Sequence, residues 1–196
     1  MKKVILIALA ASTAIATPAL AQSVTTGTIN ITGSVAGKCS VVPSNSGNTF
    51  GGPVSMGELA LADGTLKAST TLEGTFGTAG GGALSAKVVC TSPDATVTVD
   101  ADPLVSAVAV TAGSGYANTV NFTADAKFTK TGGVIVPVSN ASTAAAATSA
   151  TLGGRLAATS TNIVISTSNW KTPGVGDILV ADNNYTGKIT VTVSPL

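Results

Sequence analysis

The side chains that could carry out covalent or metal chemistry are few in this sequence. There are two cysteines, Cys39 and Cys90, and there is no histidine. The lack of histidine excludes a Ser-His-Asp triad, an imidazole general base and a histidine-ligated zinc site. Three interpretations of the cysteines are open at this point: a disulfide, two free thiols, or a metal site with two thiolate ligands. The metal site is the weakest, because two ligands without histidine make a poor site.

Two further features could belong to a binding site, but the sequence around each of them argues against it. Asp100 and Asp102 form a carboxylate pair, but they stand beside Pro103 at the end of an expected strand, and calcium takes six or more oxygen ligands. The glycine-rich residues 77–82 suggest a phosphate-binding loop, but no convincing strand precedes them and no Lys-Ser/Thr follows, so a hairpin loop is the better interpretation. We therefore expect a protein that is not an enzyme, with no metal, no cofactor and no small-molecule substrate.

The overall charge argues against nucleic acid as a partner. Only 10% of the residues are charged, compared with about 25% in an average domain. The formal net charge is +1, whereas nucleic-acid or polybasic membrane binding needs a basic surplus. The 44% of hydrophobic residues are enough to build a core.

The N-terminus is predicted to be an export signal, residues 1–21. Two lysines precede an apolar run of about a dozen residues, and an Ala-Leu-Ala sequence places the cleavage site between Ala21 and Gln22. A permanent membrane anchor is the alternative, but the run is shorter than the about 20 residues that span a bilayer. An exported protein enters an oxidising compartment, which favours a disulfide between the two cysteines.

Beyond the leader, short apolar or alternating runs rich in valine, isoleucine and threonine predict β-strands separated by clusters of turn-forming residues. Eight or nine such strands predict one antiparallel sandwich or barrel. No amphipathic helix of ten residues is evident, and residues 141–152 are open to a short helix or a surface loop. The expected strands are residues 28–35, 86–89, 95–100, 105–111, 119–128, 133–138, 162–166, 177–180 and 188–193.

The segment after the cleavage site has the pattern of a strand with one apolar face. Side chains alternate between the two faces of a strand, so Gly27, Ile29, Ile31, Gly33 and Val35 share one face. A glycine inside a strand marks a place where another segment approaches closely. The segment is either the first strand of the chain's own sheet or a strand that serves a partner.

This segment, the cysteines and the C-terminal strand together resemble the subunits of chaperone–usher pili. The layout is also similar to the archaic, spore-coat-protein-U-like branch of that family. The resemblance covers the two ends and the cysteine frame, whereas residues 91–182 show only generic strands. The matching features are Ile29-x-Ile31-x-Gly33-x-Val35, Cys39, Val88-Val89-Cys90 and Ile189-x-Val191-x-Val193.

The resemblance implies an all-β fold, an incomplete immunoglobulin-like antiparallel β-sandwich that is completed by donor-strand exchange. Residues 22–36 would be the donor-strand extension and residues 37–196 the sandwich domain. The donor residues Gly27, Ile29, Ile31, Gly33 and Val35 would fill the groove of another subunit. The strand at the edge of the groove would carry Ile189, Val191 and Val193.

The resemblance also implies a function and a set of partners. The chain would be a structural subunit of a surface filament, a pilus or coat-like fibre that serves adhesion or biofilm formation. Its partners would be identical or related subunits joined head to tail, a periplasmic chaperone and an outer-membrane usher. Its location would be the surface of a Gram-negative bacterium, reached through the periplasm.

Two features depart from that family, and a second class of function stays open. Many pilins carry a tyrosine next to last, where this chain has Pro195, and residues 141–154 look like an insertion. The alternative is a self-contained secreted β-sandwich that binds a surface and uses residues 22–35 as its own first strand. Clustered exposed aromatic residues would favour it, but Tyr116, Trp170 and Tyr185 are expected in loops far apart in sequence.

Overall fold

The computed structural model describes residues 29–42, 50–158 and 160–196. The expected export signal, its cleavage site between Ala21 and Gln22, and Gly27 lie outside these residues. The chain divides into two units, Met1–Ser34 and Val35–Leu196. Residues 29–34 of the first unit carry no helix or strand. The second unit, called the domain below, contains all the described secondary structure.

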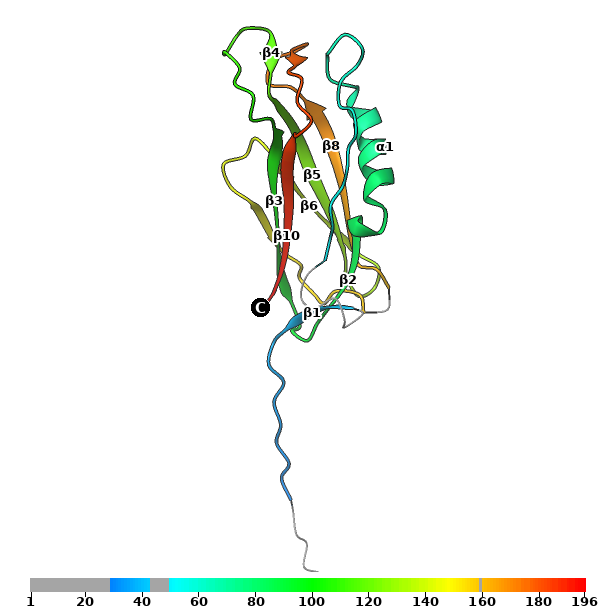
Figure 1. Cartoon of the computed structure of the whole chain (residues 1–196). Coiled ribbons are helices and arrows are strands. Elements are labelled where there is room, and N and C mark those ends of the chain that lie inside the picture. The colour runs from blue at the N-terminus through cyan, green and yellow to red at the C-terminus, as the bar shows by residue number, and fades with distance from the viewer. Residues whose placement is uncertain (1–28, 43–49, 159) are drawn as a thin grey trace, which may run out of the picture. The chain divides into compact units, whose positions relative to one another are not determined.

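The domain is mostly β-strand with one α-helix (Figure 1). Eight strands form a sheet in the order β1-β2-β8-β5-β3-β10, with β6 paired to β5 and β7 paired to β3. Its pairings are antiparallel, whereas β4 and β9 form a short parallel pair. The strands are β1 (Cys39–Val42), β2 (Ser85–Cys90), β3 (Ala95–Val105), β4 (Tyr116–Ala117), β5 (Thr119–Thr129), β6 (Ile135–Ala141), β7 (Thr148–Thr151), β8 (Ile163–Lys171), β9 (Ile178–Leu179) and β10 (Thr186–Pro195).

The sheet curls where its central strands β3 and β5 part. These strands pair only at one end, where Leu104 lies opposite Val120 and Val105 opposite Thr119. Farther along, β5 pairs with β6 instead, and residues 96–99 of β3 pair with β7. The two halves of the sheet therefore turn their apolar faces toward each other.

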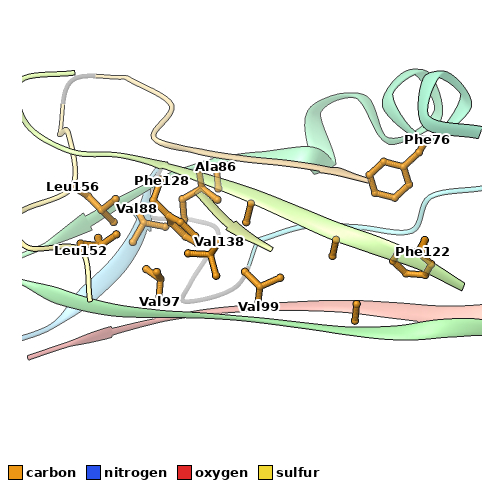
Figure 2. Close-up of a cluster of buried hydrophobic side chains, with 14 of the residues drawn as sticks. Phe76, Ala86, Val88, Val97, Val99, Phe122, Phe128, Val138, Leu152 and Leu156 are labelled. Atoms are coloured by element: carbon orange, nitrogen blue, oxygen red, sulfur yellow. The ribbon is translucent and has the colours of Figure 1, made fainter. Parts of the chain in front are cut away.

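The core fills the space between these two halves (Figure 2). Alternate residues of β3 and β5 are buried, as the period of two in a strand requires. Val97, Val99 and Phe128 have no exposed surface. Burying a side chain of this size contributes about 1.5–3 kcal/mol, so these two strands carry much of the domain's stability.

The disulfide Cys39–Cys90 joins β1 to β2, as predicted. The two cysteines lie opposite each other in the strand pairing, with their Cα atoms 4.1 Å apart. Cys39 begins β1 and Cys90 ends β2. The bond closes a loop with a sequence separation of 51 residues, which contributes about 4 kcal/mol if the unfolded chain behaves as an entropic loop.

The helix α1 (Ser69–Gly80) was not expected from the sequence. It is followed by a 3₁₀ turn, η2 (Gly81–Leu84). Together they contain the glycine-rich residues 77–82, so the interpretation of these residues as a hairpin loop is wrong. Glycine costs about 1 kcal/mol relative to alanine in a helix interior, and the sequence therefore gave a weak helix signal.

Tertiary contacts stabilise α1 despite its glycines. Leu72 and Phe76 lie one turn apart and are buried in the core. The hydroxyl of Ser69 accepts a hydrogen bond of 2.8 Å from the backbone N–H of Trp170 in β8. Packing against β8 thus offsets a poor intrinsic propensity.

Four other expectations differ from the structure. Residues 141–152 form neither a helix nor a plain loop, because a turn returns the chain into β7, which pairs with β3. The expected strand at 105–111 is a loop beyond Val105, and residues 29–35 of the expected first strand carry no strand. Trp170 lies in β8 rather than in a loop, and it is buried.

The all-β class is confirmed as a curled, largely antiparallel sheet with one helix. In the described parts of the chain, no helix is both long and apolar enough to cross a membrane.

Candidate functional site

One edge of β10 has no partner strand among the described residues. β10 pairs with β3 along its whole length, from Thr186 to Pro195, and it stands at the end of the sheet order. Unpaired backbone N–H and C=O groups at such an edge can pair with an added strand. The three apolar residues predicted for the edge strand, Ile189, Val191 and Val193, all lie on β10 and are partly buried against the core.

A groove of about 550 Å³ runs beside this edge. One wall is β10, from Gly187 to Val191. The opposite wall is an irregular segment, residues 50–56, whose apolar side chains Phe50, Val54 and Met56 are partly buried against the core. In Figure 1 this segment runs between β10 and α1.

The floor of the groove is aromatic and aliphatic. Phe122 of β5 and Trp170 of β8 stack with ring centroids 4.8 Å apart and planes inclined by 25°. Both are buried, and the indole N–H of Trp170 donates to the hydroxyl of Thr167 at 3.1 Å. Stacked pairs add about 0.5–1.5 kcal/mol to the burial of their area. The floor is therefore rigid and apolar, with its polar atom already satisfied.

A smaller hollow of about 200 Å³ continues the groove toward the disulfide. It shares Phe50 and Val191 with the larger groove and extends along β10 to Val193. Cys39 and Val41 of β1 line its other side. The unpaired edge of β10 is thus flanked by apolar surface over the positions of Ile189, Val191 and Val193 alike.

The wall opposite β10 also lacks backbone pairing. No backbone–backbone hydrogen bond joins residues 50–57 to any other residue that the structure describes. The segment is held by its side chains, and Gly51 and Gly57 adopt positive φ values of 95° and 61°. A strand inserted into the groove would therefore meet unpaired backbone groups on both sides.

The other end of the groove carries its polar groups. Tyr185 donates a hydrogen bond of 2.9 Å to the carbonyl of Val180. Burial, followed by the nearby Asp182 carboxylate, raises the pKa of this phenol above its usual range. Lys188 forms an ion pair with Asp102, with Nζ and Oδ2 3.2 Å apart. The groove is uncharged along the rest of its lining, which suits an uncharged occupant.

The predicted donor residues that the structure describes are exposed. Ile29, Ile31 and Val35 are 87%, 92% and 79% exposed. Gly33 has no atom within 4 Å of the position that a Cβ would take. Exposed large apolar side chains at three alternate positions are unusual unless a partner covers them.

The other sequence candidates for chemistry form no site. Among the described residues, no group of three or more potential metal ligands is close enough to hold an ion. Asp102 is engaged by Lys188, and the glycine-rich stretch belongs to α1 and η2.

Sequence reasoning missed two parts of the groove. The wall at residues 50–56 gave no strand pattern, and the aromatic floor joins residues from two strands about fifty positions apart in the sequence. Neither has a local signal. The one available hint was that Phe50, Val54 and Met56, all at even-numbered positions, are apolar residues in a Gly/Pro-rich segment.

Comparisons with protein-family models, curated proteins and solved structures give no match for this chain.

Proposed function

We propose that this chain is the subunit of an exported surface filament that assembles by donor-strand complementation. In this proposal the domain is an incomplete immunoglobulin-like sandwich, and the groove beside β10 takes residues 22–35 of another copy. Two observations together carry the proposal. An apolar groove runs along the edge of β10 that has no partner strand, and the chain also has an exposed segment whose apolar side chains lie on one face.

The energetics support an inserted strand. The unpaired edge of β10 offers backbone hydrogen bonds, and an added strand satisfies such groups without strain. Ile29, Ile31 and Val35 would each contribute about 1.5–3 kcal/mol on complete burial. Gly33, on the same face between Ile31 and Val35, limits the bulk that the groove must admit.

The contact is head-to-tail, because the donor segment and the groove are different surfaces of the chain. A heterologous contact that does not close into a ring yields a filament. The proposal includes a periplasmic chaperone that covers the groove before assembly and an outer-membrane usher that delivers the filament to the surface of a Gram-negative cell. Adhesion or biofilm formation follows from that location.

The test uses a domain that lacks residues 22–35 but keeps Ala36, whose carbonyl accepts a hydrogen bond from Thr91. We expect this domain to fold, to retain the disulfide and to form no filaments. A synthetic peptide of residues 22–36 should bind it and raise its Tm by about 5–10 °C at a free concentration of about 100 Kd.

Matched peptide variants identify the face that binds. Ile31→Asp should abolish the rise in Tm, because an unpaired carboxylate would enter an apolar groove. Thr32→Asp adds the same charge on the opposite face and should leave most of the rise intact. Filaments from the truncated domain, or a full chain that stays monomeric with its own segment paired to β10, would contradict the proposal.

A further inference from the structure

The domain has two ends of different character. At one, the loop end, residues 57–68, 106–118 and 172–185 meet near β4 (Figure 1). Ile178 joins the three loops, since it bridges to Thr65 and its backbone N–H donates to the carbonyl of Gly115 at 2.9 Å.

The opposite end, the base, lies beside the C-terminus of β10. It consists of residues 36–38, 91–94, 130–133 and 153–157 together with Leu196. Asp94 ties these segments together, because its side chain accepts a hydrogen bond from the N–H of Gly154 at 3.1 Å and its carbonyl accepts one from the N–H of Leu196 at 3.3 Å. The N–H of Thr131 donates to the carbonyl of Arg155 at 2.9 Å.

The loop end is acidic. Its three loops carry four carboxylates against a single ammonium group, that of Lys67, which gives a net side-chain charge of −3. Of the lysines in the nearest β-strands, Lys188 is already paired with Asp102, and the exposed Lys171 at the end of β8 reduces the net charge to −2. The four carboxylates are those of Glu58, Asp63, Asp177 and Asp182.

The base is basic. Its segments carry Lys38, Lys130 and Arg155 against one acidic side chain, that of Asp94, which gives a net side-chain charge of +2. Lys127, two residues before the end of β5, adds to the positive side. The side chains of Lys38 and Arg155 are exposed.

The loop end also exposes apolar side chains. Leu61, Tyr116 and Val175 are 52%, 52% and 107% exposed. Val108 and Ile178 of the same loops are exposed as well. Exposed apolar groups gathered on one end of a domain, among charges of one sign, are typical of a surface that meets a partner.

Ala36, which follows the last apolar residue of the donor segment, is anchored to the base. The hydroxyl of Thr91 donates to the carbonyl of Ala36 at 2.9 Å, and the backbone N–H of Lys38 donates to the same hydroxyl at 3.0 Å. The backbone N–H of Thr91 donates to the carbonyl of Lys38 at 2.9 Å. The last apolar residue of the donor segment, Val35, therefore precedes the anchored residues directly.

From these observations, and resting on the proposed function, we infer that the basic base of one copy docks on the acidic, apolar loop end of the next. A donor strand that runs antiparallel to β10 leaves the groove at the loop end, and the anchor at Ala36 brings the base of its own domain to that end. The opposite orientation would bring two basic ends together, which like-charge repulsion disfavours. The charges thus fix the polarity of the filament as well as the contact.

The test follows filament growth of the full chain by light scattering and electron microscopy at about 20 mM and about 500 mM salt. Glu58→Lys with Asp63→Lys reverses the loop end, and Lys38→Glu with Arg155→Glu reverses the base. Each pair should slow growth about tenfold at low salt, and the difference should vanish at high salt because exposed charges are then screened. The four substitutions combined should restore growth, because the ends are complementary again.

Controls separate this contact from the proposed function. Asp100→Lys reverses a single charge away from both ends and should leave growth unchanged. Circular dichroism and binding of the peptide of residues 22–36 to truncated versions of the same variants should be unaltered, which excludes misfolding and damage to the groove. Equal growth rates for all variants at low salt, or no rescue in the combined variant, would overturn the end-to-end contact while the peptide result upholds the groove. Absence of filaments from the unaltered chain would overturn both.

Discussion

β3 and β10 are neighbouring strands with the same local sequence and different surroundings. Each contains Thr-Val-Thr-Val, at residues 96–99 and 190–193, and the register places Val97 opposite Val193 and Val99 opposite Val191. The valines of β3 have no exposed surface, whereas those of β10 are only partly buried.

The difference comes from the neighbours of the two strands. Residues 96–99 of β3 pair with β10 on one side and with β7 on the other. The two valines among them are buried in the core. β10 has one partner and borders the groove. A strand's alternation decides which face is apolar, but its neighbours decide how much of that face is buried. The half-buried face of β10 is the surface that an incoming strand would cover.

The largest effect is expected from the disulfide. Its residue Cys39 lines the smaller hollow beside Val193 of β10. Replacing both cysteines, Cys39→Ser with Cys90→Ser, should lower the free energy of unfolding by about 4 kcal/mol, because the unfolded chain regains the entropy of the loop. Urea unfolding of the purified protein measures this change. An unchanged midpoint would mean that β1 is held by its strand pairing alone. Thiol mapping of the unaltered protein should find neither cysteine free.

A matched pair of substitutions tests the comparison of the two strands directly. Val99→Ala should cost about 2–3 kcal/mol, because it opens a cavity in a closed core. Val191→Ala should cost about 1 kcal/mol or less in the free domain, because part of the lost side chain is already in contact with water. The measurement is the urea midpoint of both variants.

The same pair sharpens the comparison once the groove is filled. With the peptide of residues 22–36 at saturation, the cost of Val191→Ala should rise toward that of Val99→Ala, because the valine is then buried on both sides. Thr192→Ala, on the outer face of β10, serves as the control and should change little in either state. Equal costs for both valines in the free domain would contradict the open groove.

The sequence predicted the strands whose pattern is local. The alternation of β3, β5 and β10 and the isolation of Cys39 and Cys90 were sufficient for those elements. α1 was missed because its glycines lower the helix propensity, while Leu72 and Phe76 stabilise it through contacts with distant strands. Residues 141–152 were left undecided because an alanine-rich stretch carries no strand signal, and pairing with β3 determines its fold.

The groove shows the same division between local and distant information. Ile189, Val191 and Val193 were identified as an apolar face from their spacing, but the spacing cannot reveal that the strand lacks a second partner. The stacking of Phe122 on Trp170 and the wall at residues 50–56 depend on how distant segments meet. Sequence patterns therefore predicted the strand at the edge of the candidate site, whereas the floor and the opposite wall of the groove were found only in the structure.

The start of β10 differs from β3 in its backbone, and Gly187 tests that difference. The pairing with β3 shifts between Thr186 and Lys188. A Cβ on Gly187 would lie 2.9 Å from the carbonyl oxygen of Pro103. Gly187→Ala should therefore cost about 1–2 kcal/mol by urea unfolding.

A second glycine gives the control of opposite sign. Gly74 lies within α1 and has no atom within 4 Å of a Cβ position. Gly74→Ala should stabilise the domain by about 0.5–1 kcal/mol, because alanine loses less backbone entropy in a helix. Stabilisation by both substitutions would show that the close approach at Gly187 does not constrain the strand.

The smallest effect is expected at the end that β3 and β10 share. Asp94 precedes β3, and its pKa lies below the ordinary value because the N–H groups of Gly154 and Ala95 donate to its carboxylate, with a further contribution from Lys130. A lowered pKa in the folded state means that the carboxylate stabilises the domain above pH of about 4, and this contribution is lost as the pH falls through the folded value. Asp94→Asn should therefore remove part of the acid dependence of stability, so that urea midpoints of the variant fall less than those of the unaltered domain between pH 5 and pH 2.

The acid dependence that remains in the variant should come from Asp63 and Asp182, whose pKa values are lowered by hydrogen bonds from Thr65 and from Ser106. Parallel pH profiles for the two proteins would show that the N–H groups at this end bind the ionised and the protonated carboxyl equally well.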